Sequence, residues 1–145
     1  MTPSPPWSPD PAFETGSTPL LDLDLCQVRL QEDARFPWLV LLPRVVGAIE
    51  LLDLSGDERA QLTEEAALAS AAVRAMGEAM GRPVEKLNLA ALGNVTPQLH
   101  LHVLGRRRDD GLWPDPVWGR GQARAFADGE RAAVVSAARA VLAPA

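Results

Sequence analysis

The chain has 145 residues, 47% of them hydrophobic, which is enough to bury the core of one domain of ordinary size. Its net charge of −5 opposes nonspecific attraction to polyanions, so we expect no nucleic acid polymer among its partners. No stretch approaches the roughly 18 apolar residues of a membrane-spanning helix and no leader-like segment opens the chain, so we expect a cytoplasmic protein without a membrane partner.

The first nineteen residues are rich in proline, at positions 3, 5, 6, 9, 11 and 19. Proline lacks a backbone donor, so we expect this segment to enter neither a helix nor a central strand. The sequence predicts an extended, partly mobile arm at residues 1–19 and a single domain at residues 20–145. Trp7 and Phe13 leave two alternatives open, because the arm could hang loose or could dock these aromatic rings on the domain.

Two strands are predicted next, at residues 25–30 and 37–42, and Pro43 ends the second because it cannot donate to a ladder hydrogen bond. Ser55 and Glu58 then have the spacing of a capping box, which predicts the start of a helix. Apolar residues follow at steps of four and three, as on the buried face of a helix: Leu62, Ala66, Ala69, Val73, Met76 and Met80. Gly81 and Pro83 supply the stop signal of this helix.

The second half of the chain predicts strands at residues 86–92 and 98–104, joined by a turn at residues 93–97. Residues 106–120 are charged and interrupted by proline and glycine, so we expect them to be irregular. A second helix is predicted from Asp128, which we expect to cap it. Strands precede and follow a helix without a repeating β-α-β rhythm, so the predicted fold class is α+β.

Both histidines of the chain lie in the predicted strand at residues 98–104. Side chains alternate along a strand, so Gln98, His100 and His102 share one face while the leucines and valine between them take the core. The backbones of the two histidines would lie roughly 6.6 Å apart, close enough for both imidazoles to reach different atoms of one phosphate.

The residue pattern alone leaves two other interpretations of this face open. The strand could simply expose two imidazoles to water, as antiparallel sheets often do on one side. Alternatively, His100 and His102 could bind a metal ion with a third ligand such as Cys26 or Asp24, although nothing in the spacing of those two residues recommends them. Cys26 is the one cysteine of the chain, so no internal disulfide and no thiolate metal cluster is expected.

The turn before the histidines fits phosphate binding, because a glycine lets the backbone approach an anion and successive amides can point at its oxygens. Its residues are Gly93, Asn94, Val95 and Thr96. A Gly-Asn pair is by itself a common hairpin turn with no ligand, so only the position of the turn favours the functional interpretation.

Residues 86–104 read KLNLAALGNVTPQLHLHVL, and this run resembles the signature region of histidine triad (HIT) proteins. In that region three histidines alternate with apolar residues after a glycine-containing turn. A weaker resemblance extends over residues 25–119 and includes WPDPVWG at residues 113–119, which looks like a bacterial branch of the superfamily. The first histidine of the triad is Gln98 here, a substitution that we expect in that branch.

The resemblance implies a role for each matching position. His100 falls on the nucleophile that attacks the α-phosphorus and forms a nucleotidyl-histidine, and His102 falls on the histidine that contacts phosphate oxygens. Gln98 replaces a supporting histidine, and its amide can hydrogen-bond but cannot take up a proton at neutral pH. Asn94 matches a position that contacts phosphate, and Asn88 lies near one that reaches the ribose or the phosphate.

The resemblance also implies an antiparallel sheet of about five strands, a long packed helix and a C-terminal helix, in a homodimer. Its implied function is that of a hydrolase or nucleotidyl transferase that binds a small-molecule nucleotide: a nucleoside phosphoramidate, a dinucleoside polyphosphate or a related ester. No cofactor and no metal are expected. The alternative is a catalytically weak nucleotide sensor or dimeric adaptor on the same scaffold.

The segment at residues 106–120 adds two expectations. Trp113 and Trp118 could stack on a bound base, but we expect them to pin the loop to the body or to another subunit. Three arginines, at positions 106, 107 and 108, are expected to form a solvated turn whose charges Asp109 and Asp110 partly balance.

Overall fold

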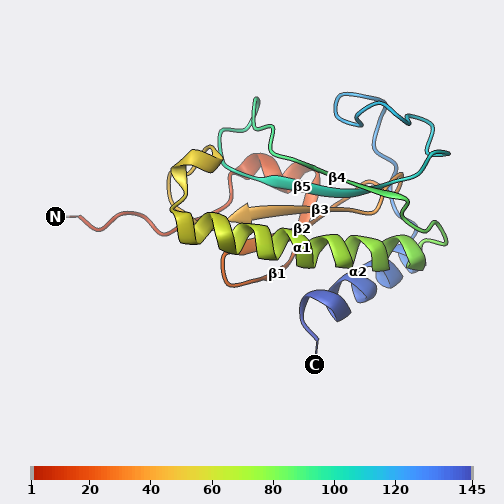
Figure 1. Ribbon diagram of the computed structural model, residues 1–145, viewed down its shortest axis with the longest axis horizontal. Coiled ribbons are helices and arrows are strands. Elements are labelled where there is room, and N and C mark those ends of the chain that lie inside the picture. The colour runs from red at the N-terminus through yellow and green to blue at the C-terminus, as the bar shows by residue number, and fades with distance from the viewer. Residues whose placement is uncertain (1, 145) are drawn as a thin grey trace.

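One antiparallel sheet of five strands organises the chain, and the computed structural model describes residues 2–144 of it (Figure 1). The strands run in the spatial order β1-β2-β3-β5-β4. Their bounds are β1 Ser17–Asp22, β2 Cys26–Gln31, β3 Trp38–Pro43, β4 Lys86–Ala90 and β5 Leu101–Arg106. The sheet with its two helices confirms the predicted α+β class.

Helix α1 spans Gly56–Ala79 and begins at the predicted capping box. The Ser55 hydroxyl accepts a hydrogen bond from the Glu58 amide at 3.1 Å, and the Glu58 carboxylate accepts one from the Ser55 amide at 2.7 Å. Gly81, just beyond the helix, has a φ of +69°, a left-handed conformation that favours glycine at a helix stop. The predicted start and end of this helix are therefore confirmed.

Helix α2 spans Asp128–Leu142 and lies beside α1 (Figure 1). The predicted cap is wrong by one residue: Ala127 occupies the N-cap, without a side-chain hydrogen bond, and Asp128 is the first helical residue. Its carboxylate there still favours the positive end of the helix dipole. In the described range 2–144, neither helix combines the length and the apolar character needed to cross a membrane.

The N-terminal segment corrects one prediction. Residues Pro11–Thr15 form a short 3-10 helix, η1, in spite of their proline. Pro11 stands in the first turn, where its missing N–H would have no partner in any case, and the Asp10 carboxylate caps the Ala12 amide at 2.9 Å. The strand β1 that follows lies at the edge of the sheet and carries Pro19 at a register irregularity, where proline is tolerated. The division into an arm of residues 1–19 and a domain of residues 20–145 stays a prediction.

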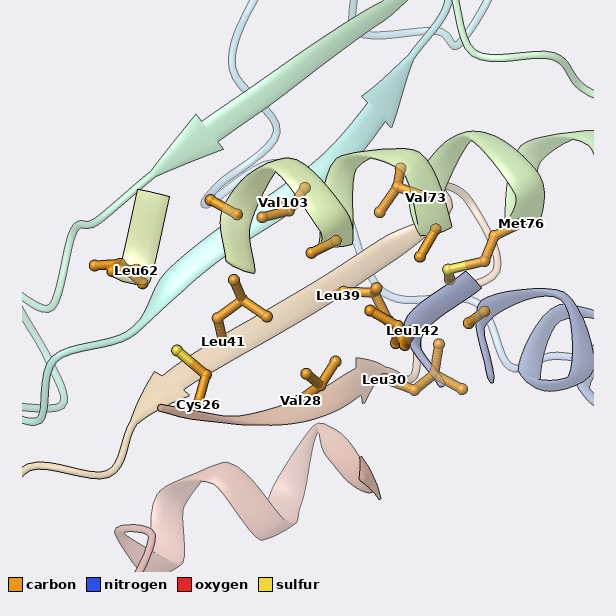
Figure 2. Packing of buried hydrophobic residues seen from close by; sticks show 14 of the residues in the cluster. Cys26, Val28, Leu30, Leu39, Leu41, Leu62, Val73, Met76, Val103 and Leu142 are labelled. Carbon is orange, nitrogen blue, oxygen red and sulfur yellow. The ribbon is translucent and has the colours of Figure 1, made fainter. Parts of the chain in front are cut away.

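Aliphatic side chains fill the space between the sheet and the two helices (Figure 2). Alternate residues of the central strands point into this layer, as the period of a strand requires. The buried residues labelled there come from β2, β3, β5, α1 and α2: Cys26, Val28, Leu30, Leu39, Leu41, Leu62, Val73, Met76, Val103 and Leu142. We call this side of the sheet the helix face.

The opposite side of the sheet carries a second, aromatic cluster, and we call it the histidine face. Its buried members are Phe36, Trp38, Val40, Leu42, Leu104 and Val117. The partly buried rings of Trp7, Phe13 and Trp118 pack against them, from the N-terminal segment and from the loop after β5. Irregular segments and the short η1 helix therefore cover this face of the sheet, as the long helices cover the other face.

Candidate functional site

The strand that carries the histidines begins later than predicted. β5 starts at Leu101, so His100 lies directly before it and Gln98 lies in a bend. The backbone explains the difference: the Gln98 amide donates to the Thr96 carbonyl at 2.9 Å, and the Leu99 amide donates to the Ala48 carbonyl at 3.0 Å. These amides bond to neighbouring loops rather than to the sheet. The prediction that Gln98 belongs to the strand is therefore wrong.

The two imidazoles nevertheless come together on the histidine face, with ring centroids 5.1 Å apart. His100 is 8% exposed, and its Nδ1 lies 2.7 Å from the backbone carbonyl oxygen of Gln98. A carbonyl oxygen can only accept, so this contact assigns the ring hydrogen to Nδ1. The Nε2 atom of His100 then keeps a free lone pair, which is what a nucleophile requires.

His102 carries the complementary tautomer. The indole Nε1 of Trp38 donates to its Nδ1 at 3.1 Å, so Nδ1 is an acceptor and Nε2 carries the hydrogen. Burial, with a smaller contribution from nearby His100, lowers the pKa of His102 from 6.5 to about 4. The site therefore combines the Nε2 lone pair that the His100 tautomer leaves free with an imidazole, His102, that is uncharged at neutral pH and can donate.

His100 also lines a cavity of about 290 Å³. The wall comes from the loop before α1, the chain after β4 and the residue before His100: Ile49, Glu50, Leu51, Leu52, Ala91, Leu92, Gly93 and Leu99. In the described part of the chain, Glu50 is the one residue of this wall with a charged side chain. The cavity is therefore mainly apolar, with an imidazole at one side.

The predicted phosphate-binding turn is only partly beside this cavity. Gly93 lines it and has a φ of +67°, a left-handed conformation that suits glycine. Asn94 and Val95 are exposed, and Val95 is 96% exposed, while Thr96 is half-buried. Of the four residues, the structure therefore places Gly93 against the cavity that His100 lines.

Asn88 hydrogen-bonds a residue that does not line this cavity. Its side-chain oxygen accepts a hydrogen bond from Nη1 of Arg106 at 3.1 Å. Arg106 corrects the expectation of a solvated arginine turn, because it is 1% exposed and forms an ion pair with Asp110 at 2.7 Å. Its guanidinium also lies 5.7 Å from the ring centroid of Trp113, so that tryptophan helps to pin the loop, as expected.

The side chain of Gln98 holds the N-terminal segment rather than an imidazole. Its Oε1 accepts from the Asp10 amide at 2.8 Å, and its Nε2 donates to the Ser8 carbonyl at 2.9 Å. The ring of Phe13 packs edge-on against His100, with centroids 4.8 Å apart. Of the two alternatives for this segment, the structure shows the docked one.

Sequence reasoning missed two residues of the site, Trp38 and Phe13. Nothing local marks Trp38, because its hydrogen bond joins β3 to β5. Phe13 did carry a signal, since an aromatic residue in a proline-rich segment is unexpected unless it docks. Trp118, from the loop after β5, adds a third ring with its centroid 5.4 Å from that of His102.

The metal alternative requires a third ligand near the two imidazoles. Cys26 lies in the cluster on the helix face, on the other side of the sheet from the two histidines. Burial raises the pKa of its thiol, with Glu65 adding to the effect, so the thiolate form that binds metals is disfavoured. In residues 2–144, no three histidine, cysteine or acidic side chains are grouped so that they could hold a metal ion.

Comparison with known proteins gives consistent results. The family model described as HIT domain matches residues 12–109. A solved histidine triad protein from Bradyrhizobium japonicum is 40% identical, with 95% of this chain and 99% of that chain covered and a TM-score of 0.86. Histidine triad proteins from Sinorhizobium meliloti and Marinobacter aquaeolei are also similar.

The Sinorhizobium protein is 38% identical, with 91% of this chain and 94% of that chain covered and a TM-score of 0.82. The Marinobacter protein is 33% identical, with 95% and 97% covered and a TM-score of 0.84. No protein with a curated description matches the chain. The family match at residues 12–109 includes both imidazoles, and the structural matches cover more than nine-tenths of the chain.

Proposed function

We propose, because this chain belongs to the HIT domain family, that its paired histidines act on the α-phosphate of a nucleoside phosphate. The substrate class is a nucleoside phosphoramidate, a dinucleoside polyphosphate or a related ester, and the activity is that of a hydrolase or nucleotidyl transferase. One observation carries the proposal: the free lone pair of His100 lies beside the Nε2–H donor of His102. A nucleophile and an uncharged donor are what phosphoryl transfer through histidine needs.

In the proposed reaction, Nε2 of His100 attacks the α-phosphorus and forms a phosphorus–nitrogen bond while the bond to the leaving group breaks. The Gln98 carbonyl accepts from Nδ1–H throughout and stabilises the positive charge that develops on the ring. His102 donates from Nε2 to a phosphoryl oxygen. Water then attacks the phosphorus and the phosphorus–nitrogen bond breaks, so that its electron pair returns to Nε2 and His100 is neutral again. The nucleoside monophosphate leaves, and the proton of the attacking water passes to solvent.

We assign Gln98 to the position of the first triad histidine and Gly93, Asn94, Val95 and Thr96 to phosphate binding. The backbone carbonyl of Gln98 supports this assignment, because it orients His100. The contact of Gly93 with the cavity supports the second assignment. Asn88 remains a candidate for the ribose or phosphate, and it would have to exchange its hydrogen bond with Arg106 for one with the ligand.

Replacing the nucleophile tests the proposal directly. In His100→Ala, kcat/KM for adenosine phosphoramidate or a diadenosine polyphosphate should fall by at least about 10³-fold, while nucleotide affinity changes only a few-fold. Mass spectrometry of the wild-type protein, quenched during turnover, should reveal a nucleotidyl adduct on His100. Gln122→Ala is the control, because Gln122 is exposed in a loop. Wild-type turnover in His100→Ala would show that the nucleophile is misassigned.

A nucleotide sensor or adaptor is the second candidate, and Gln98 is the observation that favours it. A carboxamide cannot relay a proton as a histidine can, so binding could persist where turnover is weak. Gln98→His separates the two functions: a sharp gain of hydrolysis from an inert parent would favour the sensor. A parent that is already active, with little gain in the variant, would favour the enzyme.

We also propose that the protein forms a homodimer. Strand β4 is an edge of the sheet, and apolar side chains near it are exposed, including Leu89 at 46% and Leu92 at 48%. Such edges and patches are usually covered in stable proteins. Light scattering after size exclusion should give twice the 15.5 kDa mass of the chain, and a Leu89→Lys variant should shift it toward one chain.

A further inference from the structure

In the N-terminal segment, Trp7 packs on the histidine face and one amide side chain bonds residues 8 and 10; we call residues 2–12 the strap. The Gln98 carboxamide bonds the strap twice, accepting from the Asp10 amide at 2.8 Å and donating to the Ser8 carbonyl at 2.9 Å. A single side chain thus satisfies one backbone donor and one backbone acceptor two residues apart. Loss of this carboxamide would release both bonds at once.

The chain just after the strap is fixed independently of Gln98. The Ser17 hydroxyl donates to the Phe13 carbonyl at 2.6 Å, and Glu14 forms an ion pair with the fully buried Arg29 at 3.2 Å. Phe13 therefore stays against His100 whether or not the strap is docked. The boundary between the held and the releasable part falls within η1.

Few hydrogen bonds hold the docked strap in place. The indole Nε1 of Trp7 is buried, yet it has no hydrogen-bond partner within residues 2–144. A buried donor without a partner disfavours the docked state relative to one in which water reaches the nitrogen. Proline at positions 3, 5, 6, 9 and 11 removes five backbone donors that could otherwise fasten the segment.

The docked strap also occupies a donor that an anionic ligand would use. Nε2 of Gln98 bonds the Ser8 carbonyl oxygen, and a phosphoryl oxygen is an acceptor of the same kind with more negative charge. A phosphate bound at His100 and His102 would therefore compete with the strap for Gln98.

We propose that Gln98 is a latch that holds the strap across the histidine face and that a phosphate ligand opens it by displacing the Ser8 carbonyl from Nε2. This inference rests on the proposed function for the identity of the ligand. In this proposal the carboxamide at the first triad position controls the access of a ligand to His100 and His102. Gln98 is here a positioning residue for the strap and touches the ligand only after release.

Hydrogen–deuterium exchange of the full chain tests the latch without any ligand. Asp10 and Ala12 supply the hydrogen-bonded amides of the strap. Gln98→Met keeps the length of the side chain and removes both bonds, so exchange of the peptide at residues 2–12 should accelerate by about tenfold. Exchange of α1 should not change, and Gln122→Ala should match the wild type throughout. Wild-type exchange of the strap in a folded Gln98→Met would overturn the latch.

Adenosine 5′-monophosphate is the probe for opening. With wild-type protein it should accelerate exchange at residues 2–12, while Gln98→Met should show no further acceleration. Gln98→Glu keeps an acceptor for the Asp10 amide and loses the donor to Ser8, so it should give an intermediate rate and serves if Gln98→Met does not fold. If calorimetry detects nucleotide binding while exchange at residues 2–12 does not change, the latch is overturned and the proposed function stands. Absence of nucleotide binding would instead overturn the proposed ligand, while the exchange of Gln98→Met still reports on the latch itself.

Discussion

The two faces of the sheet share their strands and differ in what covers them. On the helix face, α1 and α2 close over aliphatic side chains (Figure 2). On the histidine face, the strap, η1 and the loop after β5 supply aromatic rings, around two imidazoles. Because side chains alternate along each strand, neighbouring residues such as Leu39 and Val40 serve different faces. One strand can thus contribute to stability with half of its residues and to chemistry with the rest.

The faces also differ in how well their polar atoms are satisfied. Within residues 2–144, the buried side-chain nitrogens that lack a partner are the indole nitrogens of Trp7 and Trp118. Both rings pack on the histidine face. An unpaired buried donor costs about 1–3 kcal/mol, so this face is less stable than its burial suggests. Ligands and moving segments are expected on such a surface rather than on the helix face.

Truncating a core side chain on the helix face should give the largest effect on stability. Met76 is fully buried in the cluster beneath α1. Met76→Ala should lower the free energy of unfolding by about 2–5 kcal/mol, through lost burial and a residual cavity. Urea denaturation measures this change. Turnover per folded molecule should stay at the wild-type level, and a large loss of turnover in the folded variant would mean that the two faces are not separable.

Acid should weaken the histidine face within a defined pH range. The pKa of His102 is about 4 in the folded protein against 6.5 for an ordinary histidine, because burial opposes its charge. Between these values the unfolded chain binds the proton and the folded chain does not, so the free energy of unfolding falls as pH falls from 6.5 to 4. The total loss should be roughly 3 kcal/mol, measured by urea denaturation at each pH.

The control for this titration removes the group. His102→Asn should flatten the dependence of stability on pH between 4 and 6.5, whereas Met76→Ala should lower stability by the same amount throughout that range. Asp33 and Asp110 have pKa values lowered from 3.8, so their contribution is lost only at more acidic pH. An unchanged slope in His102→Asn would contradict the assignment.

Removing the cap of α1 should give the smallest effect. Ser55→Ala deletes the oxygen that accepts from the Glu58 amide, and it should lower the free energy of unfolding by about 1 kcal/mol. The midpoint of thermal unfolding measures this change. Exchange of the strap should be unaffected, because the cap belongs to the helix face. Faster exchange at residues 2–12 would show that the faces are coupled.

Elements fixed by local patterns could be predicted from the sequence. The capping box of Ser55 and Glu58 gave the start of α1, and the apolar spacing gave its buried face. Pro43 gave the end of β3. In these cases the deciding contacts lie within a few residues of each other, so the sequence contains them directly.

Features decided by distant partners could not be predicted. Gln98 left the strand because its neighbours bond to loops and its side chain bonds to residues 8 and 10. Arg106 is buried because Asp110 and two aromatic rings surround it. Trp38 contacts His102 across 64 positions of sequence. Alternation along a strand predicted that the two imidazoles would meet, but not which tautomer each would adopt.

The partners that set those tautomers have a consequence for the environments in which the protein can operate. His100 is oriented by a peptide oxygen and His102 by an indole nitrogen, and neither group gains or loses a proton at any pH at which proteins stay folded. A carboxylate in either place would tie the orientation of a ring to its own ionisation and to the ionic strength of the medium. Here uncharged groups assign the hydrogens, so the orientation of neither ring depends on a neighbouring charge or on the ionic strength of the medium.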